Sequence, residues 1–121
     1  MNSLLRILNP LHLLNASRYS SKGFGFMLRN ERAFQQELIL LIAGVPLAIW
    51  LGDSGVERAL LIGSILLAIL VEVVNSAVET VVNRISLEQH ELSGQAKGLG
   101  SFAVAIALIN IVVVWVLVLV D

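Results

Sequence analysis

The chain has 121 residues, of which 57% are hydrophobic and 14% charged, and its formal net charge is −1. With a mean hydropathy of +0.87, it is too apolar and too poor in charge for an ordinary soluble domain, which places it among integral membrane proteins. No global basic field points to nucleic acid. The absence of cysteine excludes disulfides, thiolate nucleophiles and cysteine-based metal sites. The length predicts one domain over residues 1–121.

Residues 1–30 are amphipathic rather than spanning. Leucines alternate there with Arg6, Asn9 and His12, and further basic residues follow among aromatic ones. This pattern is typical of a helix that lies in the membrane interface; the alternative is a disordered, positively charged tail. We expect Pro10 and the closely spaced Gly23 and Gly25 to interrupt or bend the helix.

Three longer apolar stretches predict transmembrane helices over residues 33–51, 56–85 and 98–120. Trp50 marks the far interface of the first span, as an aromatic belt residue would. Residues 52–55 form a turn by composition, and residues 86–96 are expected to form a polar loop. The architecture predicted from these features is an all-α membrane protein with an N-terminal surface helix.

The distribution of Lys and Arg predicts the orientation of the chain. All of these residues except Arg58 fall in the N-terminal region or in the 84–97 loop. The positive-inside rule therefore puts the N-terminus and this loop in the cytoplasm, and the C-terminus on the opposite side of the membrane.

A polar stripe interrupts the second span. At 100° per residue, one narrow helix face carries Glu72, Asn75, Ser76, Glu79 and Asn83. Carboxylates inside a membrane helix are costly and favour a functional site; polar contacts that hold a helix bundle together are the alternative. Glu72 lies about 10 Å deeper than Glu79 along the helix axis.

The predicted cytoplasmic rim gathers Glu31, Glu79, Lys97 and the carboxylates of the 88–91 loop. Carboxylates suit Mg²⁺, which also retains waters and substrate phosphates, and a lysine suits a phosphate. A deeper carboxylate beside an amide could accept a proton from a lipid hydroxyl. Phosphoryl transfer to a lipid alcohol is therefore one candidate chemistry, and proton or ion transport along the stripe is another.

The sequence carries neither a Walker A motif nor the protein-kinase signature set. Three helices also leave little room for a substrate cleft. A homo-oligomer that shares its sites between subunits would provide one, and closed symmetric oligomers are common.

The stretches that surround the stripe resemble the bacterial integral-membrane diacylglycerol kinases. The resemblance is carried by residues 19–23, 30–37, 72–79, 82–85, 88–97 and 100–101. It implies a homotrimeric inner-membrane kinase that transfers the γ-phosphoryl group of MgATP to diacylglycerol, giving phosphatidic acid.

The resemblance also implies roles for individual residues. Glu72 would be the catalytic base, supported by Asn75, and Glu31 and Glu79 would bind the metal. The residues implied at the ATP site are Tyr19, Glu31, Glu79, Glu88, His90 and Lys97. Those implied at the lipid substrate are His12, Ala33, Phe34, Gln36, Glu37, Trp50, Glu72 and Ser101.

Three positions depart from the family pattern. Gly98 and Asn83 stand where the family usually has Asp, and His12 stands where a basic residue is expected near the lipid and nucleotide entrance. Undecaprenol or another lipid alcohol is an alternative acceptor. A catalytically weak or non-enzymatic bundle is a further alternative because of Gly98 and Asn83.

Overall fold

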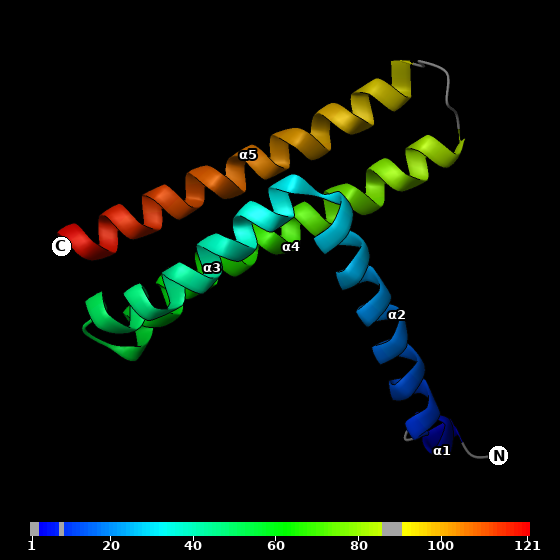
Figure 1. Ribbon diagram of the computed structural model, residues 1–121, viewed down its shortest axis with the longest axis horizontal. Coiled ribbons are helices and arrows are strands. Elements are labelled where there is room, and N and C mark those ends of the chain that lie inside the picture. Colours follow the sequence, from blue (N-terminus) through cyan, green and yellow to red (C-terminus); the bar gives the residue numbers. More distant parts are fainter. Residues whose placement is uncertain (1–2, 8, 86–90) are drawn as a thin grey trace. The chain divides into compact units, whose positions relative to one another are not determined.

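The computed structural model describes residues 3–7, 9–85 and 91–121, and every regular element in them is a helix (Figure 1). The helices are α1 (Ser3–Ile7), α2 (Pro10–Asn30), α3 (Arg32–Leu51), α4 (Gly55–Ile85) and α5 (Glu91–Val120). They fall into two compact units, residues 1–32 and residues 33–121.

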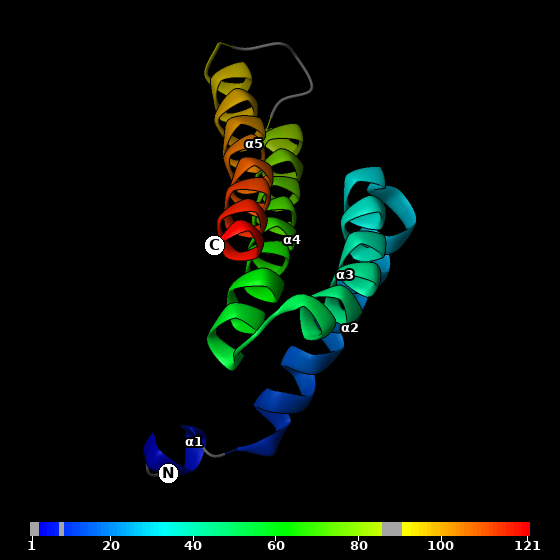
Figure 2. The same ribbon diagram turned by 90° about the vertical axis from the view of Figure 1, so that its left-hand side faces the viewer.

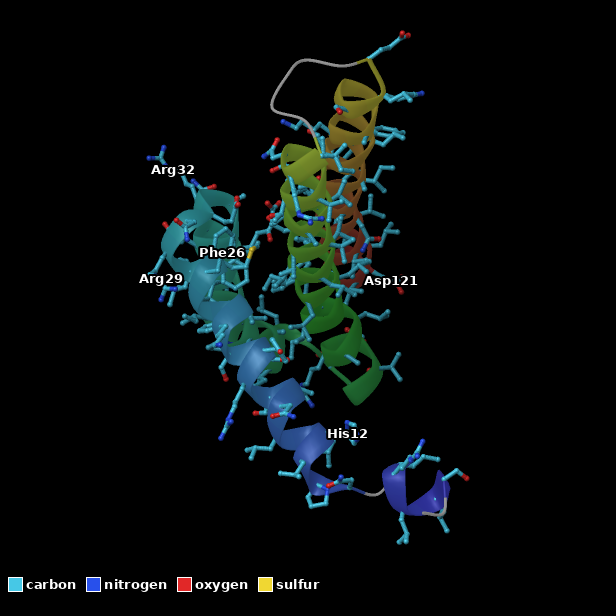
Figure 3. All side chains as sticks on the ribbon, turned by 90° about the vertical axis from the view of Figure 1, so that its right-hand side faces the viewer. His12, Phe26, Arg29, Arg32 and Asp121 are labelled. Atoms are coloured by element: carbon cyan, nitrogen blue, oxygen red, sulfur yellow. The ribbon has the colours of Figure 1, made fainter. Side chains whose placement is uncertain are left out.

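The first unit contains α1 and α2. Asn9 has an extended backbone and its side-chain oxygen accepts a hydrogen bond from the Leu11 N–H at 3.0 Å, so it caps α2. Pro10 occupies the first turn, where its missing N–H costs nothing. The expected interruption at Pro10 is thus confirmed, whereas α2 continues through Gly23 and Gly25, where an interruption was also expected. Figure 3 marks His12 and Arg29 near the two ends of α2.

The second unit contains three helices that are long and apolar enough to cross a membrane, α3, α4 and α5. The predicted all-α membrane architecture is therefore confirmed. The expected spans 33–51 and 56–85 agree closely with α3 and α4. The third helix begins earlier than expected, because residues 91–96, predicted as loop, form the first turns of α5. Glu91 in the first turn of α5 favours this start, since a carboxylate interacts well with a helix N-terminus.

The predicted turn between the first two spans is present between α3 and α4. The Ser54 hydroxyl accepts a hydrogen bond from the Glu57 N–H at 3.1 Å, and the Glu57 carboxylate accepts one from the Asp53 N–H at 3.5 Å. These two bonds resemble a capping box, which satisfies free N–H groups at a helix start. Gly52 is required here because a Cβ at this position would lie 2.8 Å from the Ala48 carbonyl oxygen.

The apolar core of the second unit lies where its three helices meet. Leu61, Ile65 and Ala68 on α4 are fully buried, and Figure 2 shows α4 and α5 running side by side. Gly44 of α3 packs so closely on Ile65 that an added Cβ would lie 2.6 Å from its Cδ1. The Trp115 indole of α5 donates a hydrogen bond to the Leu61 carbonyl oxygen at 3.1 Å. This packing sets the rotation of α4, and with it the direction of the polar stripe.

Candidate functional site in the membrane-spanning helices

The buried face of α4 changes from apolar to polar along its length. Its buried residues follow helical spacing and are Leu61, Ser64, Ile65, Ala68, Glu72, Asn75 and Ser76. Of the five residues in the predicted polar stripe, Glu72, Asn75 and Ser76 lie on this buried face, together with Ser64, which was not predicted. Glu79 is half-buried and Asn83 is exposed, so the stripe leads from the interior of the helix bundle to its surface.

Two acidic side chains are buried in the membrane-spanning helices α3 and α4. Glu37 and Glu72 are each only 5% exposed, and their carboxyl groups interact electrostatically. Among the described residues, the Glu37 Oε2 atom is buried without a hydrogen-bond partner. The Glu37 side chain is therefore buried in the second unit, within electrostatic range of Glu72. Burying two acidic groups together is costly, which favours a functional reason for the pair.

The amide of Asn75 connects the buried and half-buried parts of the stripe. Its Nδ2 group donates to Glu79 Oε1 at 3.5 Å. Its oxygen is buried and, within the described part of the chain, accepts no hydrogen bond. Gly100 of α5 lies directly against this oxygen, and a Cβ at position 100 would collide with it. Glycine at position 100 thus lets α5 approach the amide.

The Ser76 hydroxyl completes this polar region. It is buried one helical turn from Glu72 and, within the ranges described above, makes no hydrogen bond. Three buried polar atoms that lack partners therefore cluster in one part of the bundle: Glu37 Oε2, Asn75 Oδ1 and Ser76 Oγ. Buried polar groups are normally hydrogen-bonded, so this region is suited to bind a polar group of a ligand or substrate.

The other predicted site residues of the second unit lie apart from this buried region. Phe34 is buried, whereas Lys97 and Ser101 on α5 are exposed. Trp50 is 79% exposed and lies about 20 Å from Glu37 along α3, at 1.5 Å per residue. A substrate that contacted both residues would have to be long.

The first unit carries the remaining predicted residues. Glu31 is half-buried after the end of α2, where its N–H donates to the Met27 carbonyl oxygen at 3.0 Å. Tyr19 is exposed, and the Lys22 ammonium lies 6.0 Å from the centre of its ring. Glu88 and His90 lie outside the described residues.

A divalent cation fits the chemistry of Glu79, the half-buried carboxylate of the polar stripe. Within residues 3–7, 9–85 and 91–121, no three Asp, Glu or His side chains gather as a complete metal site. Mg²⁺ in phosphoryl-transfer sites uses one or two carboxylates and completes its shell with waters and substrate phosphates. The Glu79 carboxylate, with an oxygen near the Asn75 amide, is a donor of this kind.

Sequence reasoning missed two features of this site. Neither the pairing of Glu37 with Glu72 nor the approach of Gly100 to Asn75 could be read from helical periodicity. Both depend on how separate helices rotate against one another. The only available signals were the acidic residue inside an apolar span and the glycine in the first half of α5.

The three membrane-crossing helices and their buried acidic groups define a small integral membrane protein with a polar site inside its helix bundle. A profile of the family described as prokaryotic diacylglycerol kinase matches residues 18–119. The chain therefore belongs to the prokaryotic diacylglycerol kinase family, and it is a kinase.

Individual relatives agree with this assignment. A diacylglycerol kinase from Haemophilus influenzae is 47% identical over 104 residues, covering 86% of this chain and 88% of the relative. The one from Escherichia coli K12 is 46% identical over 107 residues, 88% of each chain. The one from Pseudomonas aeruginosa PAO1 is 47% identical over 107 residues, 88% of this chain and 87% of the relative.

Proposed function

We propose that this protein phosphorylates diacylglycerol with ATP to give phosphatidic acid, in the inner membrane of a bacterium. The observation that carries the proposal is the buried cluster around Glu72, in which several polar atoms lack partners inside a membrane-spanning bundle. Family membership supports the reaction class, and the names of the relatives support the acceptor.

In this proposal, Glu72 is the general base. It accepts the proton of the lipid hydroxyl while the hydroxyl oxygen bonds to the γ-phosphorus of ATP. The bond from this phosphorus to the bridging oxygen breaks, and ADP leaves. The hydrogen bond from Asn75 to Glu79 holds the amide next to the carboxylates, so Asn75 supports the site without taking the proton.

The nucleotide side of the site uses the more exposed groups. Glu31 and Glu79 would hold Mg²⁺, which neutralises phosphate charge when bound. Lys97, exposed on α5, would contact the phosphates, and Tyr19, Glu88 and His90 would line the nucleotide. The lipid would contact His12, the segment from Ala33 to Glu37, Trp50 and Ser101.

We further propose a homotrimer in which neighbouring chains complete each active site, with the N-terminus in the cytoplasm and the C-terminus in the periplasm. One chain leaves α5 almost entirely uncovered, since Ala107 is the one buried residue of this fully described helix. A multi-angle light-scattering mass of a single chain for the active, detergent-solubilised enzyme would contradict the trimer.

The experiment that tests the proposed reaction is a mixed-micelle assay with radiolabelled ATP, Mg²⁺ and a panel of lipid alcohols. We expect labelled phosphatidic acid from diacylglycerol. Preferential labelling of undecaprenol would instead favour the second candidate acceptor. No transfer to any lipid would defeat the kinase proposal and favour a structural or transporting bundle.

Glu72→Gln tests the base in the same assay. Glutamine keeps the shape of the side chain but cannot accept the proton, so we expect kcat to fall by about 10²–10⁴-fold, the usual contribution of a general base. A circular dichroism spectrum and an elution volume like those of the wild type are the controls for folding. Substantial activity in a folded variant would remove Glu72 from this role.

A further inference from the structure

An amide lies in the middle of the most apolar helix of the chain. Asn110 is separated from Lys97 by about 20 Å and from Asp121 by about 16 Å of helix, at 1.5 Å per residue. The hydrocarbon core of a bilayer is about 30 Å thick. Asn110 therefore lies near the middle of the membrane, where lipid headgroups and water do not reach.

No group among the described residues of the same chain satisfies this amide. In the described residues, its side chain makes no hydrogen bond, and the other polar side chains at this depth are already engaged on the same carbonyl oxygen. Ser64 donates to the Leu61 carbonyl at 2.8 Å, and Trp115 donates to it at 3.1 Å. An amide without a partner in hydrocarbon is costly, so a partner from outside the chain is expected.

Asn110 lies at the edge of an open groove between α4 and α5. This groove has a volume of about 260 Å³, and its lining includes Ala59, Gly63, Ser64, Leu67, Asn110 and Val114. Asn110 and Trp115 are separated by about 140° around α5 at 100° per residue. Because Trp115 is on the side that approaches Gly44 of α3, Asn110 is on a different side, which α3 does not cover.

Two small residues of α4 line the groove and allow another helix to approach closely. Ala59 and Gly63 are four residues apart, the small-xxx-small spacing that lets membrane helices come together. Nothing lies within 4 Å of a Cβ added at Gly63, so glycine is not needed for packing within one chain. The space next to Gly63 is therefore available to a partner.

We propose that this groove faces the three-fold axis of a trimer of this chain, where it meets the corresponding helices of the other copies and the Asn110 amides hydrogen-bond to one another. An amide both donates and accepts, so it is complementary to itself, and a second copy offers the same unused amide at the same depth. In a closed trimer, each amide can donate to the next and accept from the previous one. The inference rests on the proposed homotrimer and identifies a residue that stabilises it.

The lack of cysteine makes a direct test possible, since one introduced cysteine is then the only thiol. The test is disulfide formation by Asn110→Cys in lipid vesicles under mild oxidation, read as a dimer band on a non-reducing gel. Val112→Cys is the matched control, because it has a similar depth but points about 160° away on α5. We expect efficient crosslinking at position 110 and little at position 112. Equal crosslinking at both positions, or none at position 110, would overturn the inference.

Two further variants test the energetics by sedimentation equilibrium in detergent. Asn110→Val removes the amide and should weaken association about three- to thirty-fold, the range for one interhelical hydrogen bond. Gly63→Leu fits a single chain but fills the groove, so it should shift the protein toward monomer. Ala105→Leu, at an exposed position of α5, is its control and should leave the mass unchanged.

The outcomes separate this inference from the trimer itself. A wild-type trimer whose association is unchanged by Asn110→Val and Gly63→Leu would leave the oligomer in place and refute this contact. A wild-type monomer would refute both. Kinase activity is measured in parallel, because loss of transfer in a variant that remains trimeric would point to an effect on the active site rather than on association.

Discussion

At the scale of single residues, the membrane-spanning helices hold two acidic groups where charge is costly. Glu37 on α3 and Glu72 on α4 are buried to the same extent and lie within electrostatic range of each other. A buried carboxylate lowers the stability of the fold unless another group pairs with it. Proteins retain such destabilising groups at functional sites. Replacing one of them should therefore raise the stability of the fold and lower activity.

Glu37→Gln is expected to stabilise the fold by about 1 kcal/mol and to lower kcat/KM for the lipid. The amide keeps the shape of the side chain but removes an ionisable group from beside Glu72. Thermal unfolding in detergent and steady-state kinetics with varied diacylglycerol measure the two effects. A Glu37→Gln enzyme with unchanged kinetics would show that Glu37 serves no role in the reaction.

Gly98→Asp tests a departure from the family pattern. Gly98 is exposed and has open space beside it, so an aspartate fits without moving its neighbours. If Lys97 and its neighbour bind the nucleotide together, the variant should show a KM for ATP several-fold below that of the wild type. Gly94→Asp adds the same charge at another open glycine of α5, and an equal decrease there would indicate a general charge effect.

At the scale of elements, the site depends on the contact between α4 and α5. The two helices approach closely at Asn75 because position 100 lacks a side chain. The same pair of helices is held farther along by the hydrogen bond from Trp115 to the Leu61 carbonyl oxygen. These two contacts fix both the separation and the rotation of α5 relative to the polar stripe.

Gly100→Ala is therefore expected to destabilise the pair by about 1–3 kcal/mol, as overpacking does, and to reduce activity by displacing the Asn75 amide. Thermal unfolding in detergent measures the first effect and the micelle assay the second. Gly94→Ala, with open space, should be neutral or stabilising because alanine favours helix. The double variant Asn75→Ala/Gly100→Ala should recover stability but not activity, and a double variant as unstable as Gly100→Ala would contradict a collision with Asn75.

At the scale of the whole molecule, the asymmetric distribution of basic residues predicts one orientation. Seven of the eight Lys and Arg residues lie at or before position 32 or at positions 84 and 97, and Arg58 lies in the first turns of α4. Arg58 donates from Nε to the Ile49 carbonyl oxygen at 3.2 Å, which ties it to the end of α3. Asp121 follows α5, as Figure 3 marks.

Reporter fusions at Asp121 test this orientation. Alkaline phosphatase is active only when it reaches the periplasm, and we expect high activity for this fusion. A green fluorescent protein fused at the same position should give little fluorescence, because it does not mature after export in an unfolded state. The reverse pattern would place the C-terminus in the cytoplasm and would contradict the positive-inside prediction.

The sequence by itself determined the features that depend on local periodicity and composition. Long, predominantly apolar stretches predicted three spans, and the 3.6-residue period placed Glu72, Asn75 and Ser76 on one face of α4. The spacing of turn residues located the connection between α3 and α4. The start of α5 was missed because a polar segment that continues a helix into water resembles a loop in composition.

Only the tertiary structure decided which helix faces meet. Apart from Asn110, the second half of α5 is apolar or aromatic all round, so its periodicity does not show which side packs on α4, and α3 shows one acidic residue without indicating its partner. Packing buried Glu37 together with Glu72 inside the second unit, brought Gly100 against Asn75 and left Asn110 at an open groove. Such contacts join residues far apart in sequence and depend on the shapes of several side chains at once, which no single local pattern specifies.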